Sequence, residues 1–121
     1  MQEAAKAYSA VGVHVASQRE LEANLLLKAA SRLQAVQDGR ASGDTDLHNA
    51  LQFNRKLWTI FLNSATDDSN PLPTETRQNI ANLGIFVFKQ TMSTLTDRNL
   101  ERLNALININ RELAAGLRGL T

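Results

Sequence analysis

The clearest interruption in this sequence is the polar segment over 66–73, which ends with Pro71 and Pro73, the only two prolines of the chain. Prolines and clustered Asp, Ser and Asn residues mark turns, so this segment separates two structural elements. On both sides of it, apolar residues recur at the three- and four-residue spacing of amphipathic helices, and no run shows the alternation of a strand. The pattern predicts helices joined by a few short connections.

Glycines and capping residues divide the rest of the chain. Gly12 is expected to end a short alanine-rich helix, and Ser17 with Glu20 forms a capping-box pattern that starts the next helix. Gly39 is a natural helix stop, and Thr74 is a candidate cap after the prolines. We predict an all-α fold, a compact bundle of four main helices plus a short N-terminal helix, in one domain over 1–121. The predicted helices span approximately 3–10, 17–38, 44–65, 74–95 and 97–118.

Composition excludes several classes of function. The chain of 121 residues has no cysteine, which removes disulfides, thiolate metal sites and cysteine nucleophiles. Its formal charge is only +1, from 13 basic and 12 acidic side chains, and the longest basic run is the pair Arg55-Lys56. Proteins that neutralise several phosphates normally carry a clustered basic face, so direct nucleic-acid binding is not expected.

No pattern of catalytic or metal-ligating residues stands out. His14 and His48 are the only histidines, and they lie far apart, whereas a metal site needs three or four ligands in fixed geometry. The carboxylates Glu20 and Glu22 are two residues apart and do not share a helix face. There is no glycine-rich phosphate loop. We therefore expect no enzyme activity, no metal and no cofactor.

The sequence also lacks the apolar segments that targeting to a membrane requires. The N-terminal residues show no secretory signal, and the longest apolar run, over 83–88, is far shorter than the ~20 residues that span a bilayer. We expect a soluble protein that stays in the cytoplasm.

Two of the predicted helices carry wider apolar stripes than a small bundle needs. The helix over 74–95 has apolar residues almost all round, and Phe53 and Ile60 widen the stripe of the helix over 44–65. One interpretation is a groove that receives a helix from another protein. The other is a pair of central helices that the rest of the bundle covers.

Three residues within the stripes admit the same two interpretations. Asn110 lies near the centre of the last helix's apolar stripe, and Asn54 is in line with apolar residues of its own helix. A buried amide needs hydrogen-bond partners, either in a neighbouring helix, which we favour, or in a bound helix. Trp58 is the single tryptophan; we expect it in the core, with an anchor for a partner as the alternative.

Several blocks of sequence, in order over nearly the whole chain, resemble the FlaF family of flagellar regulators. The most distinctive is Asn54-Arg55-Lys56-Leu57-Trp58, whereas the loop over 38–46 is the least similar part. The other blocks are Ala4-Ala5-Lys6-Ala7-Tyr8, Arg19-Glu20-Leu21-Glu22-Ala23-Asn24-Leu25-Leu26-Leu27, Pro71-Leu72-Pro73, Arg77-Gln78-Asn79-Ile80-Ala81-Asn82-Leu83-Gly84 and Ile109-Asn110-Arg111-Glu112-Leu113-Ala114-Ala115-Gly116-Leu117. None of these blocks is a catalytic signature.

The resemblance implies a cytoplasmic flagellar-assembly factor that binds flagellin like a secretion chaperone and acts with an FlbT-like regulator of flagellin synthesis. Because such a protein has to hold a flagellin helix, the resemblance favours the groove interpretation. The predicted groove residues are Phe53, Asn54, Trp58, Ile60, Asn79, Ile85, Phe86, Met92 and Asn110.

Two alternatives remain at this stage. The first is direct binding of flagellin mRNA, and the second is a structural oligomer in which the wide stripes pair with another copy. The cations available to an RNA are Arg55, Lys56, Arg77, Lys89, Arg98 and Arg102.

Overall fold

The computed structural model describes the backbone of residues 2–119 and the side chains of residues 17–119. Within these residues there is no strand, and the elements are α1 (Gln2–Gln37), α2 (Asp44–Ala65), α3 (Thr74–Asp97), the short 3-10 helix η1 (Leu100–Arg102) and α4 (Leu103–Gly119). The predicted all-α class and the bundle of four main helices are confirmed. None of these helices is both long and apolar enough to cross a membrane.

The predicted division of the N-terminal region was wrong. The helices expected over 3–10 and 17–38 are parts of the single helix α1, and Gly12 lies inside it. One glycine in a helix interior costs only about 1 kcal/mol relative to alanine, which good helix formers on both sides can offset. Ser17 therefore lies in the middle of a helix, where no free backbone N–H groups need the capping box.

Helices α2 and α3 begin where the sequence places them, although the cap predicted at Thr74 does not form. The residues that precede them are Gly43 and Pro73, and neither helix start has a side-chain cap. The end of α3 differs by two residues from the prediction. Arg98 adopts a left-handed backbone conformation, φ 54° and ψ 30°, and its N–H donates to the Thr94 carbonyl at 2.8 Å.

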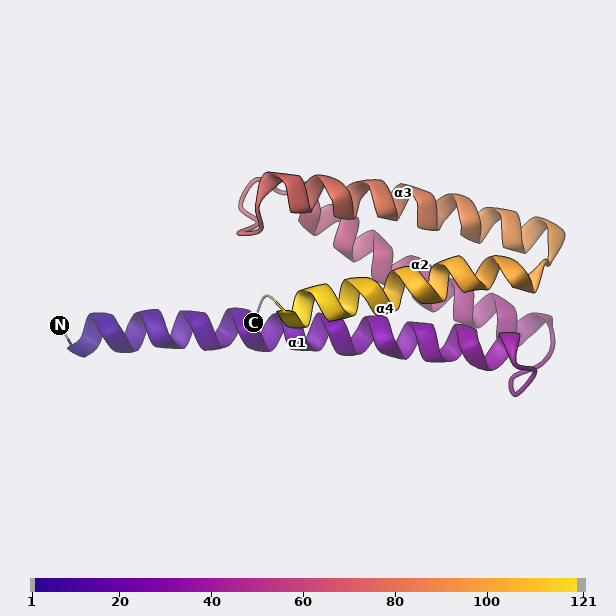
Figure 1. The fold of residues 1–121 in the computed structure, drawn as a ribbon, viewed down its shortest axis with the longest axis horizontal. Coiled ribbons are helices and arrows are strands. Elements are labelled where there is room, and N and C mark those ends of the chain that lie inside the picture. Colours follow the sequence, from indigo (N-terminus) through magenta and orange to yellow (C-terminus); the bar gives the residue numbers. More distant parts are fainter. Residues whose placement is uncertain (1, 120–121) are drawn as a thin grey trace.

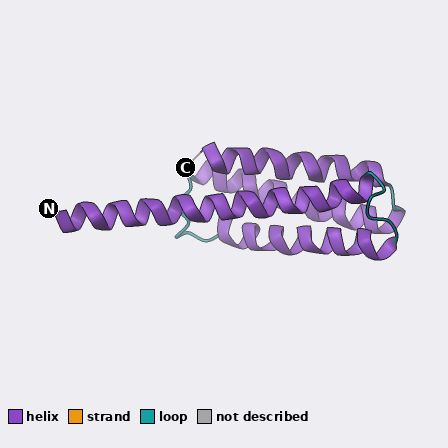
Figure 2. Ribbon diagram, turned by 90° about the horizontal axis from the view of Figure 1, so that it is seen from below, coloured by secondary structure: helices purple, strands orange, loops and turns teal. Residues whose placement is uncertain are grey.

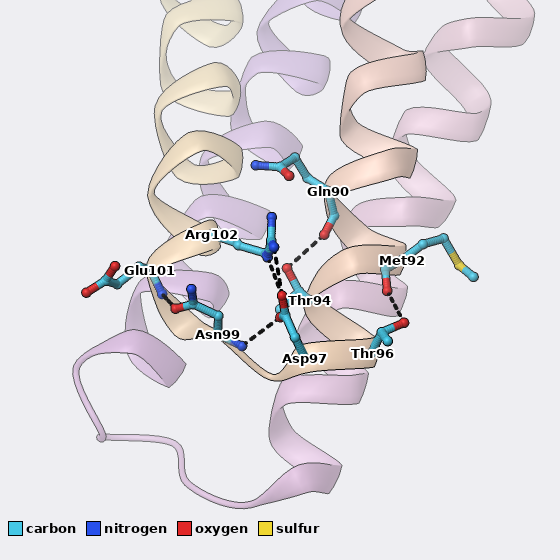
Figure 3. A network of polar contacts seen from close by, with 8 residues as sticks. All are labelled: Gln90, Met92, Thr94, Thr96, Asp97, Asn99, Glu101 and Arg102. Carbon is cyan, nitrogen blue, oxygen red and sulfur yellow. Dashed lines mark hydrogen bonds and ion pairs between the residues drawn. The ribbon is translucent and has the colours of Figure 1, made fainter.

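A polar network explains why the last helix starts later than predicted (Figure 3). Arg102 Nε donates to Asp97 Oδ2 at 2.8 Å, and the Asn99 backbone N–H donates to Asp97 Oδ1 at 3.0 Å. The Asn99 side chain in turn accepts from the Glu101 N–H at 3.1 Å and caps η1. Asp97 therefore closes the connection as the last residue of α3, and α4 begins only at Leu103.

The four helices run up and down, and α1 extends beyond the others at its N-terminal end (Figures 1 and 2). The backbone of α4 packs along α1, and α2 packs against both α1 and α3. Buried alanines on α1, among them Ala23 and Ala30, and Ala114 on α4 allow close approach of this pair. In contrast, α3 and α4 meet near η1 and diverge towards the other end of the bundle (Figure 1).

The core lies mainly between α1, α2 and α4. Leu26, Leu33, Trp58, Leu103 and Leu106 are among its completely buried large side chains. The buried face of α3 is less apolar, because it consists of Ile80, Gly84, Val87, Thr91 and Thr94. Helix α3 is therefore the member of the bundle that contributes least hydrophobic burial.

Candidate protein-binding surface

Three of the predicted groove residues form a polar network in the core. Trp58 Nε1 donates to Asn110 Oδ1 at 2.8 Å, and Asn110 Nδ2 donates to Asn54 Oδ1 at 2.6 Å and to the Leu26 carbonyl at 3.5 Å. Each of the three side chains is 0% exposed. The network joins α1, α2 and α4, so the partners of the Asn110 amide are intramolecular.

Asn54, Trp58 and Asn110 therefore do not line an open groove in this structure, contrary to their assignment as contact residues. In the sequence, apolar residues surround these three positions at helical spacing, as they would in a groove. In the bundle the three side chains are buried, so a partner can reach them only if the bundle opens. Trp58 lies in the core and the partners of Asn110 are intramolecular, as expected for both residues. The network leaves Asn54 Nδ2 buried without a hydrogen-bond partner among the described residues.

Phe53 and Ile60 lie on the side of α2 that faces α1. The Phe53 ring is half-buried beneath two cations of α1, with Lys28 Nζ 5.7 Å and Arg32 Cζ 4.4 Å from the ring centroid. Ile60 follows Phe53 by seven residues, so it lies on the same side of the helix, and it is 64% exposed. Leu21 of α1 is 58% exposed and was not among the predicted residues.

The remaining predicted residues are all exposed positions of α3. Ile85, Phe86 and Met92 are 49%, 43% and 59% exposed, and Asn79 is also exposed. Ile85 and Met92 are seven residues apart and share one side of the helix, whereas Phe86 lies about 100° further round. Figure 3 shows the Met92 side chain directed away from α4. The predicted residues are thus divided among the core, the α1-facing side of α2 and two sides of α3.

Ile85 and Met92 belong to a longer stripe, which we call the α3 seam. Its members follow one another at alternating intervals of four and three residues, the spacing of a coiled-coil stripe. The α3 seam consists of Ala81, Ile85, Phe88, Met92 and Leu95. Phe88 and Leu95 are half-buried against the core, while Ile85 and Met92 project into solvent. The interval pattern was readable in the sequence, but the surplus of apolar residues on this helix concealed it.

The position of Gly84 shows that the α3 seam lies next to α2. A Cβ atom at Gly84 would stand 3.6 Å from Trp58 Cε3 and 3.7 Å from Leu62 Cδ1, so this side of α3 faces α2. Phe88 follows Gly84 by four residues and stays on that side. A cleft at the end of the stripe is lined by both Leu95 of α3 and His48 of α2. The α3 seam therefore borders the outer junction of the two helices.

A second, more polar cleft of about 220 Å³ lies where α1 leaves the bundle. Its lining includes Arg19, Glu22, Asp67, Asn70 and Leu117. Burial raises the pKa of the Glu22 carboxyl, although Arg19 and a hydrogen bond from Gln18 act in the opposite direction. Hydrogen bonds from the backbone N–H and hydroxyl of Ser69 lower the pKa of Asp67. Over the described residues, no group of three or more His, Cys, Asp or Glu residues is placed to hold a metal ion.

Comparison with known proteins gives one assignment. A family model described as flagellar protein FlaF matches residues 4–117. Searches of curated proteins and of solved structures found no significant match. The matched range includes α2, α3 and all but the outermost two residues of α1 and of α4, together with the buried amide network and the α3 seam, so the chain belongs to the FlaF family of flagellar proteins.

Proposed function

We propose that this protein is a flagellin-binding regulator that acts in the cytoplasm, promotes flagellin synthesis and export, and works together with an FlbT-like partner. Membership of a flagellar family supports the flagellar part of this proposal. The observation that carries the binding part is the α3 seam, an apolar stripe of helical spacing with Ile85 and Met92 left in solvent. An apolar stripe of this kind is the surface that receives an amphipathic helix in helix-in-groove recognition.

The proposed ligand is a helical segment of unassembled flagellin. An amphipathic helix that packs only in the filament exposes apolar surface beforehand, and exposed apolar patches associate readily. Docking on the α3 seam covers that surface and keeps flagellin from assembling before export. The balance of free and flagellin-loaded protein then reports flagellin supply to the FlbT-like partner.

The test is complex formation between the purified full chain and monomeric flagellin, measured by gel filtration with light scattering. We expect a complex of defined mass for the natural protein and its loss for the double variant Ile85→Ser/Met92→Ser. The matched control is Leu21→Ser/Ile60→Ser, because these residues are exposed to a similar or greater extent but lie on other helices. If the control abolishes the complex and the α3 variant does not, the docking surface is misplaced; if the natural protein forms no complex, the proposed function is wrong.

Direct RNA binding is the alternative, and the ion pairs of the structure weaken it. Of the cations available to an RNA, Arg98 pairs with Asp44 and Arg102 pairs with Asp97. Arg77 Nη1 donates to the Asp67 carbonyl at 2.9 Å. Steeply salt-dependent binding of the flagellin message by the purified protein would favour this alternative.

A further inference from the structure

The middle parts of α2 and α3 carry cations but no carboxylates. Between residues 47 and 66, and again between residues 76 and 96, the sequence contains no aspartate or glutamate. The exposed cations in these stretches include Arg55 and Lys56 of α2 and Lys89 of α3. Among the described residues, the ion pairs use other cations, and none of them involves these three. The net charge near zero thus conceals a local excess of positive charge.

Two of these cations border the α3 seam. Lys89 follows Ile85 by four residues and precedes Met92 by three, so it stands beside both of them on the helix surface. Arg55 precedes Leu62 by seven residues and shares its side of α2, and Leu62 contacts α3 near Gly84. Because the helices are antiparallel, Arg55 lies two turns further towards Met92. One cation from each helix therefore stands along the exposed part of the α3 seam.

We infer that the occupant of the α3 seam is an amphipathic helix whose apolar stripe is flanked by aspartate and glutamate side chains. This inference rests on the proposed function and adds the chemistry by which the ligand is selected. Apolar contacts supply affinity to any helix with a suitable stripe, so they discriminate poorly between helices. Facing cations favour acidic flanks and repel basic ones, which supplies the discrimination and speeds encounter. The α3 seam extends over roughly 21 Å, four turns of a helix.

The test uses two synthetic helical peptides of equal length with the same apolar stripe, one with glutamate flanks and one with lysine flanks. Binding to the full chain is measured by fluorescence anisotropy at low and at high salt. We expect the glutamate peptide to bind roughly tenfold more tightly at low salt, because two charge contacts each change from repulsive to attractive. The difference should shrink at high salt, where exposed charges are screened.

Charge reversal locates the effect. In the double variant Arg55→Glu/Lys89→Glu the preference should reverse, whereas the control Arg111→Glu, at an exposed position of α4, should leave it unchanged. All these side chains are exposed, so circular dichroism is expected to show an unaltered fold. Equal binding of both peptides, or an unchanged preference in the double variant, would overturn the inference. The inference would also be overturned if neither peptide bound, while anionic lipid vesicles or an RNA oligomer bound in a manner that depends on Arg55 and Lys89.

The outcomes separate this inference from the proposed function. A flagellin complex without any preference between the peptides retains the proposed function and rejects acidic flanks as the selected feature. A preference for the glutamate peptide without a flagellin complex retains the recognition chemistry and rejects flagellin as the ligand.

Discussion

At the scale of single residues, the indole N–H of Trp58 sets the direction of the core hydrogen bonds. An indole nitrogen only donates, so the Asn110 carbonyl has to face it, and the Asn110 NH₂ group is left to face Asn54. The Asn54 carbonyl is thereby fixed as an acceptor, which leaves its own NH₂ without a partner in the part of the chain that the structure describes. The network therefore ties three helices into one arrangement at the cost of one unsatisfied donor.

Replacement of Asn110 by leucine should destabilise the protein strongly. The substitution leaves the Trp58 N–H and the Asn54 side chain buried without partners, and we expect a loss of about 2–4 kcal/mol in the free energy of unfolding. Chemical denaturation measures it. Asn108→Leu, at an exposed position of the same helix, should change stability by less than about 0.5 kcal/mol. Equal stability of the two variants would mean that the network contributes nothing.

Replacement of Gly84 by alanine should stabilise the protein, although Gly84 is buried. The new methyl group would meet Trp58 and Leu62 at 3.6–3.8 Å, which is ordinary contact distance, and alanine favours the helix by about 0.5–1 kcal/mol. Gly116→Ala is the control, because open space surrounds that position in α4. A lower midpoint of thermal unfolding for Gly84→Ala than for the natural protein would show that α2 and α3 require the glycine.

At this scale the sequence allowed a core position for Trp58 and intramolecular partners for Asn110, because apolar residues surround both at helical spacing. It did not identify the partners themselves. The hydrogen bond from Trp58 to Asn110 joins residues 52 positions apart, and periodicity within one helix carries no information on such a distant pair. For the same reason Asn54, Trp58 and Asn110 were placed in a groove together with exposed residues such as Ile85.

At the scale of elements, the end of α3 depends on a residue that is unusual for its conformation. Arg98 is the only described non-glycine residue with a positive φ, and its exposed side chain pairs with Asp44. A left-handed conformation costs a residue with a side chain roughly 1–2 kcal/mol, and glycine is the usual residue at such helix ends.

Arg98→Gly should therefore leave stability unchanged or raise it by up to about 1 kcal/mol, since the exposed ion pair is worth less than about 1 kcal/mol. Arg98→Val should lower it by about 1–2 kcal/mol, because a branched side chain is poorly tolerated at positive φ. Urea denaturation at high salt, which screens the ion pair, measures the backbone effect alone. A more stable valine variant than glycine variant would mean that the left-handed conformation is not maintained in solution.

Element boundaries were predictable where glycine or proline coincides with a loop, and less so elsewhere. The start of α2 after Gly43 and the start of α3 after Pro73 follow from such residues. Gly12 is the counterexample, because a glycine signals a break only when the flanking residues fail to continue the helix. The start of α4 was missed because the side-chain network around Asp97 decides it.

At the scale of the whole molecule, α3 is the helix that the bundle holds least. Its backbone packs chiefly on α2, and its buried face includes Gly84, Thr91 and Thr94. Local stability follows buried apolar contact, so α3 should open before the other helices. The sequence shows more apolar residues on this helix than one buried face needs. Which of them are exposed depends on which helices pack together, and the sequence does not show that. A bound helix on the α3 seam would supply some of the missing contact and stabilise α3.

Two carboxyl groups with a lowered pKa lie at the two ends of α3, Asp67 in the loop before the helix and Asp97 at its last residue. Hydrogen bonds from Ser69 lower the pKa of Asp67 before α3, and hydrogen bonds from Arg102 and from the Asn99 backbone lower the pKa of Asp97 at its end. A lowered folded-state pKa means that the folded protein binds the proton less readily than the unfolded chain. Stability from these groups is therefore present above the unfolded value of about 3.9 and is lost as pH falls through the lowered values.

Glu22 acts in the opposite direction because burial raises the pKa of its carboxyl. The folded protein binds this proton more readily, so the contribution is fully present below the unfolded pKa of about 4.3 and is lost as pH rises through the folded value. We therefore expect the free energy of unfolding to rise slightly as pH falls from neutral towards about 4.3, and to fall at lower pH as Asp67 and Asp97 become protonated. Glu22→Gln should remove the rise, and Asp97→Asn should flatten the fall.

Acid should detach α3 before the rest of the bundle unfolds. Denaturation followed by the fluorescence of Trp58, which contacts α3 at Gly84, reports on this helix, and hydrogen exchange reports on all four. Near pH 3, amides of α3 should exchange before those of α1 and α4. Asp68→Asn, in the loop before α3, is the control substitution for Asp97→Asn. Simultaneous exchange of all four helices at every pH would mean that α3 is held as firmly as the others, and that the α3 seam is not on the element that opens first.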